Sequence, residues 1–265
     1  MLDGLRSGGD GRRSVAIALT STVVFFGVAV FAITHAPGWP QVRSQFFNWH
    51  EFKSTFPDIA RAFRLNIKIF SIAEVLILVF ALFLAVLRSL PGPVFFPVRA
   101  LAIVYADLFR GIPTILVIAI LGFGAPALGL SYIPTSVTFW GIVSLVLIYS
   151  AYVSEVYRAG IESIHPSQEA AARSLGLSRS QTLRRVIPSH LNDFIGLQKD
   201  TALVGTLGAI EAFQQSQIDA NATFNFTAYL AAAVLFVAIT IPLARFTDWL
   251  TARDRRRRQA GGATP

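Results

Sequence analysis

Charged side chains within otherwise apolar segments are the residues of this sequence most able to do chemistry. They are Lys68, Glu74, Asp107, Arg110, Glu155, Lys199 and Asp200. A charge at membrane depth is costly, so it is a candidate for ligand binding unless packing explains it. Packing explanations exist: Lys68 can extend toward the outer interface, and Asp107–Arg110 and Glu155–Arg158 have the i, i+3 spacing of helical pairs. Glu74, Arg110, Lys199 and Asp200 are left as candidates for direct ligand contact, with helix packing as the alternative for Lys199 and Asp200.

The residue types do not indicate a metal site or a nucleotide-binding site. Cysteine is absent, and His35, His50, His165 and His190 are scattered, so no metal-ligand spacing is found. The lysines Lys53, Lys68 and Lys199 do not follow glycine, and the sequence has no phosphate-binding loop of the G-x-x-x-x-G-K-[ST] type. We therefore expect no catalytic residues, no bound cofactor and no enzyme activity in this chain.

The composition is that of a polytopic membrane protein. Hydrophobic residues make up 54% and charged residues only 14% of the 265 residues, and the mean hydropathy is +0.57. The apolar runs predict an all-α fold with about six transmembrane helices. The predicted spans are Ser14–Thr34, Leu65–Leu87, Ala100–Phe123, Thr138–Tyr157, Leu191–Ala212 and Phe226–Leu250. The first run is longer than the apolar region of a signal peptide, so an uncleaved span is expected.

The net charge of +8 is explained by topology rather than by nucleic-acid binding. Arginines gather at the N-terminus, in the stretch 158–190 and in the tail 253–258. The predicted outer loops carry only Arg43, Lys53, Arg61 and Arg64, all within residues 36–64. Because positive charge is enriched in cytoplasmic loops, both termini are expected in the cytoplasm. Residues 36–64 are expected to be a loop that contains a short interfacial helix near Trp49.

The stretch 158–190 is the longest hydrophilic segment between two predicted spans. Residues 168–176 (QEAAARSLG) are strong helix formers that end at Gly176, and Pro166 suits a helix start. Residues 177–185 predict a second short amphipathic segment. An ordinary solvated loop helix and a helix that binds the groove of a partner both fit this pattern.

Several segments resemble the polar amino acid branch (histidine, glutamine, glutamate and arginine permeases) of ABC importer permeases, the type I importers with an EAA loop. The stretch from Glu169 to Gly176 resembles that cytoplasmic loop, and AYVSE at 151–155 agrees with it. FRGIP at 109–113 resembles the branch's Phe-Arg-Gly-Thr-Pro, and LQKDTAL at 197–203 resembles its Leu-Lys-Asp-Thr-Ser/Ala-Leu. An amino acid zwitterion carries both charge signs, as do the four candidate path residues.

The resemblance implies three regions. Residues 1–63 hold a cytoplasmic tail, an added first span and an outer loop; residues 64–252 form the permease domain, with the coupling loop at 158–190; residues 253–265 are a basic tail. The residues implied to contact the ATPase are Glu169, Ala170, Ala171, Ala172, Arg173 and Gly176. Ala170 stands at the family's glutamate position, and about nine residues are missing after Arg185.

The resemblance also implies the partners and the location. They are two ATP-binding cassette ATPase subunits, which would use ATP and Mg, an extracytoplasmic amino acid-binding protein, and a second permease subunit in a homodimer or heterodimer. The expected location is the bacterial inner membrane. Two alternatives stay open: an ion-coupled secondary transporter or channel, for which an internal repeat is expected but not found, and a permease-like protein with impaired coupling.

Overall fold

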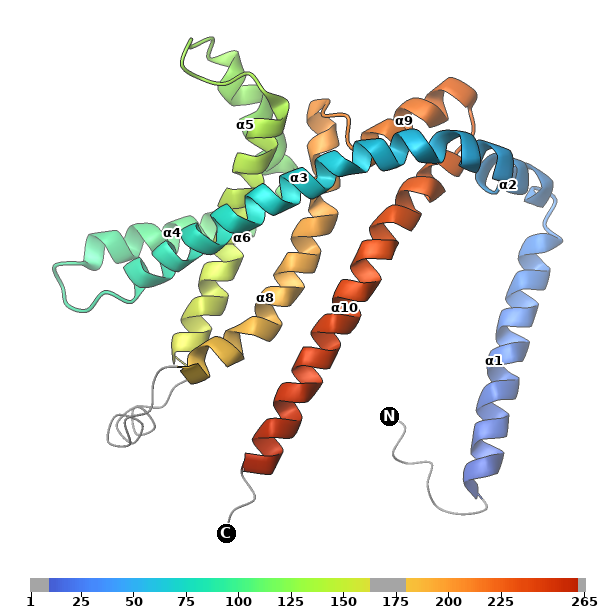
Figure 1. Ribbon diagram of the computed structural model, residues 1–265, viewed down its shortest axis with the longest axis horizontal. Coiled ribbons are helices and arrows are strands. Elements are labelled where there is room, and N and C mark those ends of the chain that lie inside the picture. Colours follow the sequence, from blue (N-terminus) through green and yellow to red (C-terminus); the bar gives the residue numbers. More distant parts are fainter. Residues whose placement is uncertain (1–9, 163–179, 262–265) are drawn as a thin grey trace.

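The structure is a computed structural model that describes residues 10–162 and 180–261, and these residues are helical almost throughout (Figure 1). The elements are α1 (Asp10–Thr34), α2 (Trp39–Phe46), α3 (Trp49–Arg88), α4 (Phe96–Gly111), α5 (Thr114–Ala127), α6 (Val137–Glu162), α8 (Ser180–Asp200), the 3₁₀ helix η2 (Thr201–Leu207), α9 (Ala212–Thr223) and α10 (Thr227–Gly261). The predicted all-α polytopic class is confirmed.

Four described helical segments are long and apolar enough to cross a membrane. They are Arg13–Thr34, Trp39–Arg88, Val137–Gly160 and Thr227–Arg253. The bent pair α4–α5 makes a fifth if both helices count as one span. The predicted span Leu191–Ala212 corresponds to the second half of α8, to η2 and to the turn after it, and it is not among these segments. Polar residues such as Asn192, Asp193 and Gln198 lower the hydropathy of α8.

The helix α3 is far longer than the predicted span, and the expectation that residues 36–64 form a loop is wrong. α3 has 40 residues, or about 60 Å of helix. Its start is fixed by Asn48, whose side chain accepts hydrogen bonds from the backbone N–H groups of His50 and Glu51 at 3.0 and 3.2 Å. Thr55, Ile59 and Phe63 are buried at helical spacing, so the polar-looking segment is amphipathic.

The predicted span at 100–123 is two helices rather than one. α4 ends at Gly111 and α5 begins at Thr114, and their axes differ by 104°. Pro113 has no N–H for a continuing helix and forces the preceding residue out of helical geometry. Ile112 accordingly has an extended backbone, with φ −96° and ψ 131°.

Two apolar clusters share α3. The first joins the middle of α3 to α5, α6, α8 and η2, with Ile77, Ile118 and Leu145 fully or almost fully buried. The second joins the N-terminal half of α3, through Ile59 and Phe63, to small residues of α9 and α10. α3 therefore organises the described fold, and it runs across the whole molecule in Figure 1.

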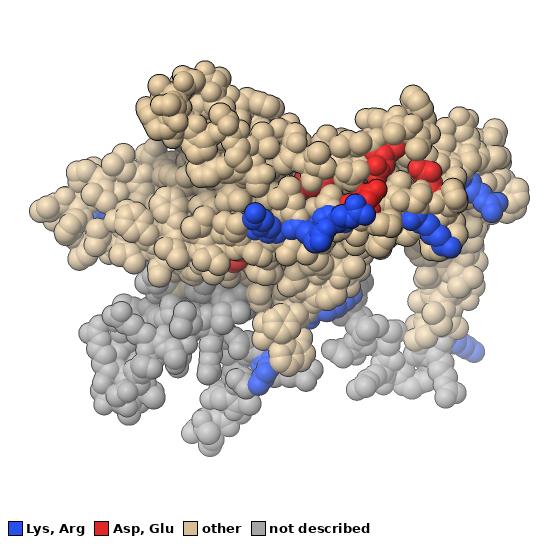
Figure 2. All heavy atoms as spheres, turned by 45° about the horizontal axis from the view of Figure 1, so that its top comes forward, with Lys and Arg blue, Asp and Glu red and all other residues tan. Residues whose placement is uncertain are grey.

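The helix α1 stands apart from this core, and its apolar window is not buried by the rest of the chain. The end of α6, the start of α8, the end of α10 and the start of α1 all point to one side of the molecule, whereas α2 and α9 lie on the opposite side (Figure 1). On that opposite side, charged side chains form one strip across an otherwise uncharged face (Figure 2).

Candidate functional site along α6 and α8

A cluster of charges lies around Glu155, near the end of α6. Its Oε2 accepts a 2.7 Å hydrogen bond from Arg88 Nη1 of α3. Its Oε1 accepts a 3.1 Å hydrogen bond from Nε of Arg158, one turn later on the same helix. Nη1 of Arg110, at the end of α4, is 4.0 Å from Oε2. One carboxylate is therefore shared by arginines from three helices, and the predicted Glu155–Arg158 pair is part of a larger cluster.

Arg110 is only loosely held in this cluster. Its guanidinium lies 5.8 Å from the centre of the Tyr152 ring, a cation–π arrangement, and its side chain is 39% exposed. The Tyr152 hydroxyl donates a 3.3 Å hydrogen bond to the Arg110 carbonyl oxygen. The expected pairing of Asp107 with Arg110 is not found among the ion pairs of the described residues, and Asp107 is exposed. Arg110 is thus partly exposed and less tightly paired than Arg88 and Arg158.

A second junction joins α3 to α8 through Glu74 and His190. Nε2 of His190 is 2.9 Å from Oε1 of Glu74, and both side chains are largely buried. The Tyr157 ring of α6 stacks on His190 at 6.4 Å between ring centres. Asp193, one turn along α8, lies within electrostatic range of both Glu74 and His190. Among the described atoms, His190 Nδ1 and Asp193 Oδ2 are buried without a hydrogen-bond partner, so this junction is polar but not fully satisfied.

A third polar contact joins α6 to the end of α8. The Tyr149 hydroxyl donates a 2.9 Å hydrogen bond to Oδ2 of Asp200. Gly196, one turn before Asp200, makes room for Tyr149, because a Cβ there would lie 3.1 Å from the tyrosine oxygen. Asp200 is therefore held by α6 through Tyr149.

The structure separates the four predicted path residues into two kinds. Glu74 and Asp200 point into the chain and have partners there. Arg110 and Lys199 are exposed, and no ion pair of Lys199 within 4.0 Å occurs in the described part of the chain. The four do not meet in one cluster. The predicted coupling residues Glu169 to Gly176 lie outside the described residues, between the end of α6 and the start of α8.

A buried polar network that the sequence did not suggest lies between α3 and the start of α9. The Asn66 amide donates to Oε2 of Glu211 at 2.9 Å and to the Thr201 hydroxyl at 3.1 Å. Asn66 Oδ1 accepts a 3.0 Å hydrogen bond from the Ala212 N–H. Asn66 and Glu211 are 1% and 0% exposed, so this network holds the α8–η2–α9 turn in place. Asn66 continues the buried stripe of α3, so helical periodicity extended to residue 55 could have found it.

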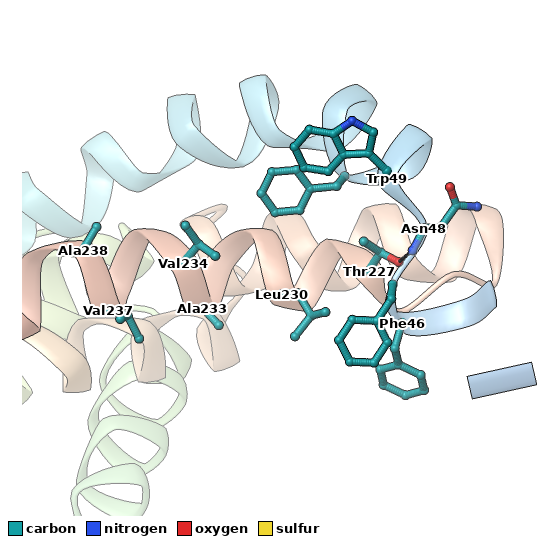
Figure 3. A pocket seen from close by; sticks show the side chains of 11 residues that line it. Phe46, Asn48, Trp49, Thr227, Leu230, Ala233, Val234, Val237 and Ala238 are labelled. Atoms are coloured by element: carbon teal, nitrogen blue, oxygen red, sulfur yellow. Dashed lines mark hydrogen bonds between the residues drawn. The ribbon is translucent and has the colours of Figure 1, made fainter. Parts of the chain in front are cut away.

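An apolar groove of about 570 Å³ lies between the start of α3 and α10 (Figure 3). Aromatic rings, including those of Phe46 and Trp49, face Leu230 and Val234 across it, and its lining contains no charged residue. A zwitterionic ligand would lose its hydration there without gaining a charged partner, so we do not place the site in this groove.

Comparison with known proteins identifies the class. The model of the family "Binding-protein-dependent transport system inner membrane component" matches residues 78–257, which is more than half of the chain. The chain belongs to this family of permease subunits, which form the translocation path of importers and are not themselves catalytic.

Two relatives and one solved structure illustrate the similarity. The probable amino-acid permease protein YxeN of Bacillus subtilis (strain 168) is 30% identical over 204 residues, which cover 73% of this chain and 90% of the relative. The probable amino-acid ABC transporter permease protein PatM of Vibrio harveyi is 32% identical, covering 66% of this chain and 84% of the relative. A crystal structure of an amino acid ABC transporter with histidines matches with a TM-score of 0.66 at 24% identity, covering 78% of this chain and 98% of that one, which shows a shared fold.

Proposed function

We propose that this chain lines the path by which an ATP-driven importer carries a polar amino acid across the bacterial inner membrane. The exposure of Arg110 and Lys199 carries this proposal. Charges within membrane-integral helices face a water-filled cavity or a partner charge rather than lipid. The related permeases are named for amino acids and for glutamine, which supports an amino acid as the substrate.

The exposed cations are proposed to meet the substrate, whose α-carboxylate an arginine can bind through paired N–H groups. Glu74 and Asp200 are both held by partners within the chain, so their proposed role in the path is to position the helices around it. A second permease subunit would cover the exposed side of Arg110 and Lys199. Whether that subunit is a copy of this chain or a similar chain is decided by which of the two co-purifies with it.

Two ATPase subunits are proposed on the cytoplasmic side and an amino acid-binding protein on the other. ATP and Mg would be used by the ATPase subunits and not by this chain. The stretch Glu169–Gly176 would fit a groove of the ATPase, because its sequence resembles the coupling loop of the family. The ATPase cycle would then rock the helices between inward-open and outward-open states.

Both termini are proposed to lie in the cytoplasm with the coupling stretch. The ends of α6 and α10 and the starts of α8 and α1 point to one side, which supports this orientation (Figure 1). Arg61 and Arg64 line a shallow depression with Asp58. Most arginines of the sequence fall in the segments proposed to be cytoplasmic.

Co-purification tests the assembly. When the tagged chain is expressed with the ATPase and binding-protein subunits of its own transporter, the ATPase should co-purify with it. ATP hydrolysis by this complex in liposomes should rise when binding protein loaded with a polar amino acid is added. Replacement of Gly176 by Asp should uncouple hydrolysis from uptake and leave membrane insertion intact. Failure to retain any ATPase, or normal uptake by Gly176→Asp, would contradict the proposed assembly or the proposed coupling stretch, respectively.

A further inference from the structure

Two buried polar contacts, the Glu74–His190 pair and the Arg88–Glu155 ion pair, connect α3 to the helices on either side of the coupling stretch. Glu74 pairs with His190 of α8 at 2.9 Å, and Arg88 pairs with Glu155 of α6 at 2.7 Å. α6 leads into the stretch, since it ends at Glu162, and α8 leads out of it. α6 and α8, the two helices that would carry motion away from the ATPase, are therefore both bound to α3.

Both pairs are shielded from solvent. The exposed fractions of the four side chains are 12% for Glu74, 17% for His190, 10% for Arg88 and 23% for Glu155. Separating the helices would leave the buried guanidinium of Arg88 without its carboxylate and the buried carboxylate of Glu74 without its hydrogen-bond partner, which opposes separation far more strongly than at the surface. By contrast, the Arg245–Asp248 pair of α10 is 81% and 71% exposed, and such a surface pair resists separation only weakly.

The two α3 residues lie on one face of their helix. They are fourteen residues apart in the sequence, which is almost four turns or about 21 Å along the axis. Ile77, Ala81 and Leu84 between them are buried. The packed face of α3 thus carries an acidic residue, Glu74, at one end and a basic residue, Arg88, at the other. The residues between them are apolar and buried.

The helices α6 and α8 also meet at this face. The Tyr157 ring of α6 lies at 27° to the His190 ring, with 6.4 Å between their centres. His190 therefore contacts α3 through its Nε2 and α6 through its ring face. Glu74 of α3 and Asp193 of α8 are acidic groups near His190, and Tyr157 is a titratable neighbour from α6.

We propose that Glu74 and Arg88 are positioning residues that clamp α8 and α6 onto one face of α3, so that displacement of the coupling stretch moves the three helices as one rigid unit. This proposal depends on the proposed function, because it assumes that an ATPase displaces the stretch. Packed interfaces transmit such displacements when they move as units rather than deform. Loss of either pair should let the stretch move without α3.

The ratio of ATP hydrolysed to amino acid imported measures this coupling. In liposomes that contain the whole transporter, Glu74→Gln and Arg88→Gln should each raise the ratio about tenfold, the factor for about 1.4 kcal/mol of lost interaction. The control Arg245→Gln removes a cation from the exposed pair and should leave the ratio unchanged. An unchanged ratio in both clamp variants would overturn the proposal. If a variant does not assemble, the exchange Glu74→His with His190→Glu keeps both side chains, and its ratio should stay within about twofold of the parent's.

A reversible cross-link gives a second test, because the chain contains no cysteine. The double variant Glu74→Cys/His190→Cys should be loosely coupled when reduced and should regain the parent ratio when its two thiols are oxidised to a disulfide. If the cross-link instead blocks uptake until reductant is added, the junction opens during transport and the proposal is wrong. No uptake by the parent transporter in the same liposomes would contradict the proposed function and not the clamp alone.

Discussion

The side-chain amide of Asn66 on α3 donates a 2.9 Å hydrogen bond to the carboxylate of Glu211, 145 residues later in the chain. Glu211 is fully buried, and it also accepts hydrogen bonds from the backbone N–H groups of Phe213 and Gln214 at the start of α9. A buried carboxylate needs several donors. This pair therefore fixes α9 and the preceding turn to the central helix.

Removal of Glu211 should destabilise the protein strongly. Glu211→Ala leaves the Asn66 amide and two backbone N–H groups with fewer partners, at an expected cost of about 3 kcal/mol. Glu211→Gln keeps an acceptor for the cap of α9 and should cost about 1 kcal/mol. In thermal unfolding of the purified chain in detergent, the parent should have the highest melting temperature, Glu211→Gln a lower one and Glu211→Ala the lowest. Equal melting temperatures for parent and Ala variants would show that this network does not stabilise the turn.

Close packing of η2 against α6 depends on Gly141. A Cβ at this position would lie 2.3 Å from Cγ1 of Val204. Gly141→Ala should therefore cost about 2 kcal/mol through overpacking. The added variant Val204→Ala should recover part of this loss, so the two changes are not additive. Gly124→Ala is the matched control, because nothing lies within 4 Å of its Cβ position. A Gly141→Ala variant as stable as Gly124→Ala would contradict the packing of η2.

Hydropathy and spacing predicted most of the membrane-spanning elements. The predicted span Thr138–Tyr157 lies within the longer helix α6, and Phe226–Leu250 lies within the longer helix α10 except for Phe226, which directly precedes it. These helices could be found because an unbroken apolar run determines them. The break at Pro113 was missed, because hydropathy does not register a single missing N–H and a restricted neighbour. The N-terminal half of α3 was missed because its apolar residues occupy only one face.

The candidate site was predicted less completely, for a physical reason. Charges within apolar runs can be read from the sequence, and Glu74, Arg110, Glu155 and Asp200 all take part in polar contacts. Apart from the Glu155–Arg158 pair within α6, which the i, i+3 spacing predicted, most partners come from other helices, and helix packing decides which helices are neighbours. His190 was therefore seen only as one of four scattered histidines, although it lies 2.9 Å from Glu74.

Arg110 and Lys199 should affect substrate affinity. Arg110→Gln and Lys199→Gln should each raise the KM for amino acid uptake about tenfold, as expected for the loss of one charge-assisted contact of about 1.4 kcal/mol. Lys68→Gln is the control, since this exposed lysine is expected to reach the outer interface. Radiolabelled uptake over a range of loaded binding protein, with basal ATP hydrolysis measured in parallel, provides the values. A KM that responds to Lys68→Gln but to neither proposed path residue would place the path elsewhere.

Asp219 on α9 should make stability depend on pH. Burial raises the pKa of this carboxyl above its ordinary value of 3.8, and the nearby Asp58 and Glu51 raise it further, although a hydrogen bond from Gln215 lowers it. The folded protein thus holds the proton more tightly than the unfolded chain. Protonated Asp219 therefore contributes to the free energy of unfolding at low pH, and this contribution is lost as the pH rises through the raised pKa.

The variant Asp219→Asn removes this titration and keeps an acceptor for Gln215. The melting temperature of the parent, relative to that of the variant, should fall as the pH rises above about 4. If the difference in melting temperature between the two proteins stays constant from pH 4 to pH 8, Asp219 has the same pKa in the folded and unfolded states.

The energy source is the most direct test of the central claim. The complete transporter is placed in liposomes, and uptake of radiolabelled glutamine, histidine, glutamate and arginine is measured with ATP, with ADP, and with a proton or sodium gradient alone. The account predicts uptake of at least one of these amino acids that requires ATP and loaded binding protein and proceeds without an ion gradient. Uptake driven by an ion gradient without ATP would contradict the account and favour a secondary transporter.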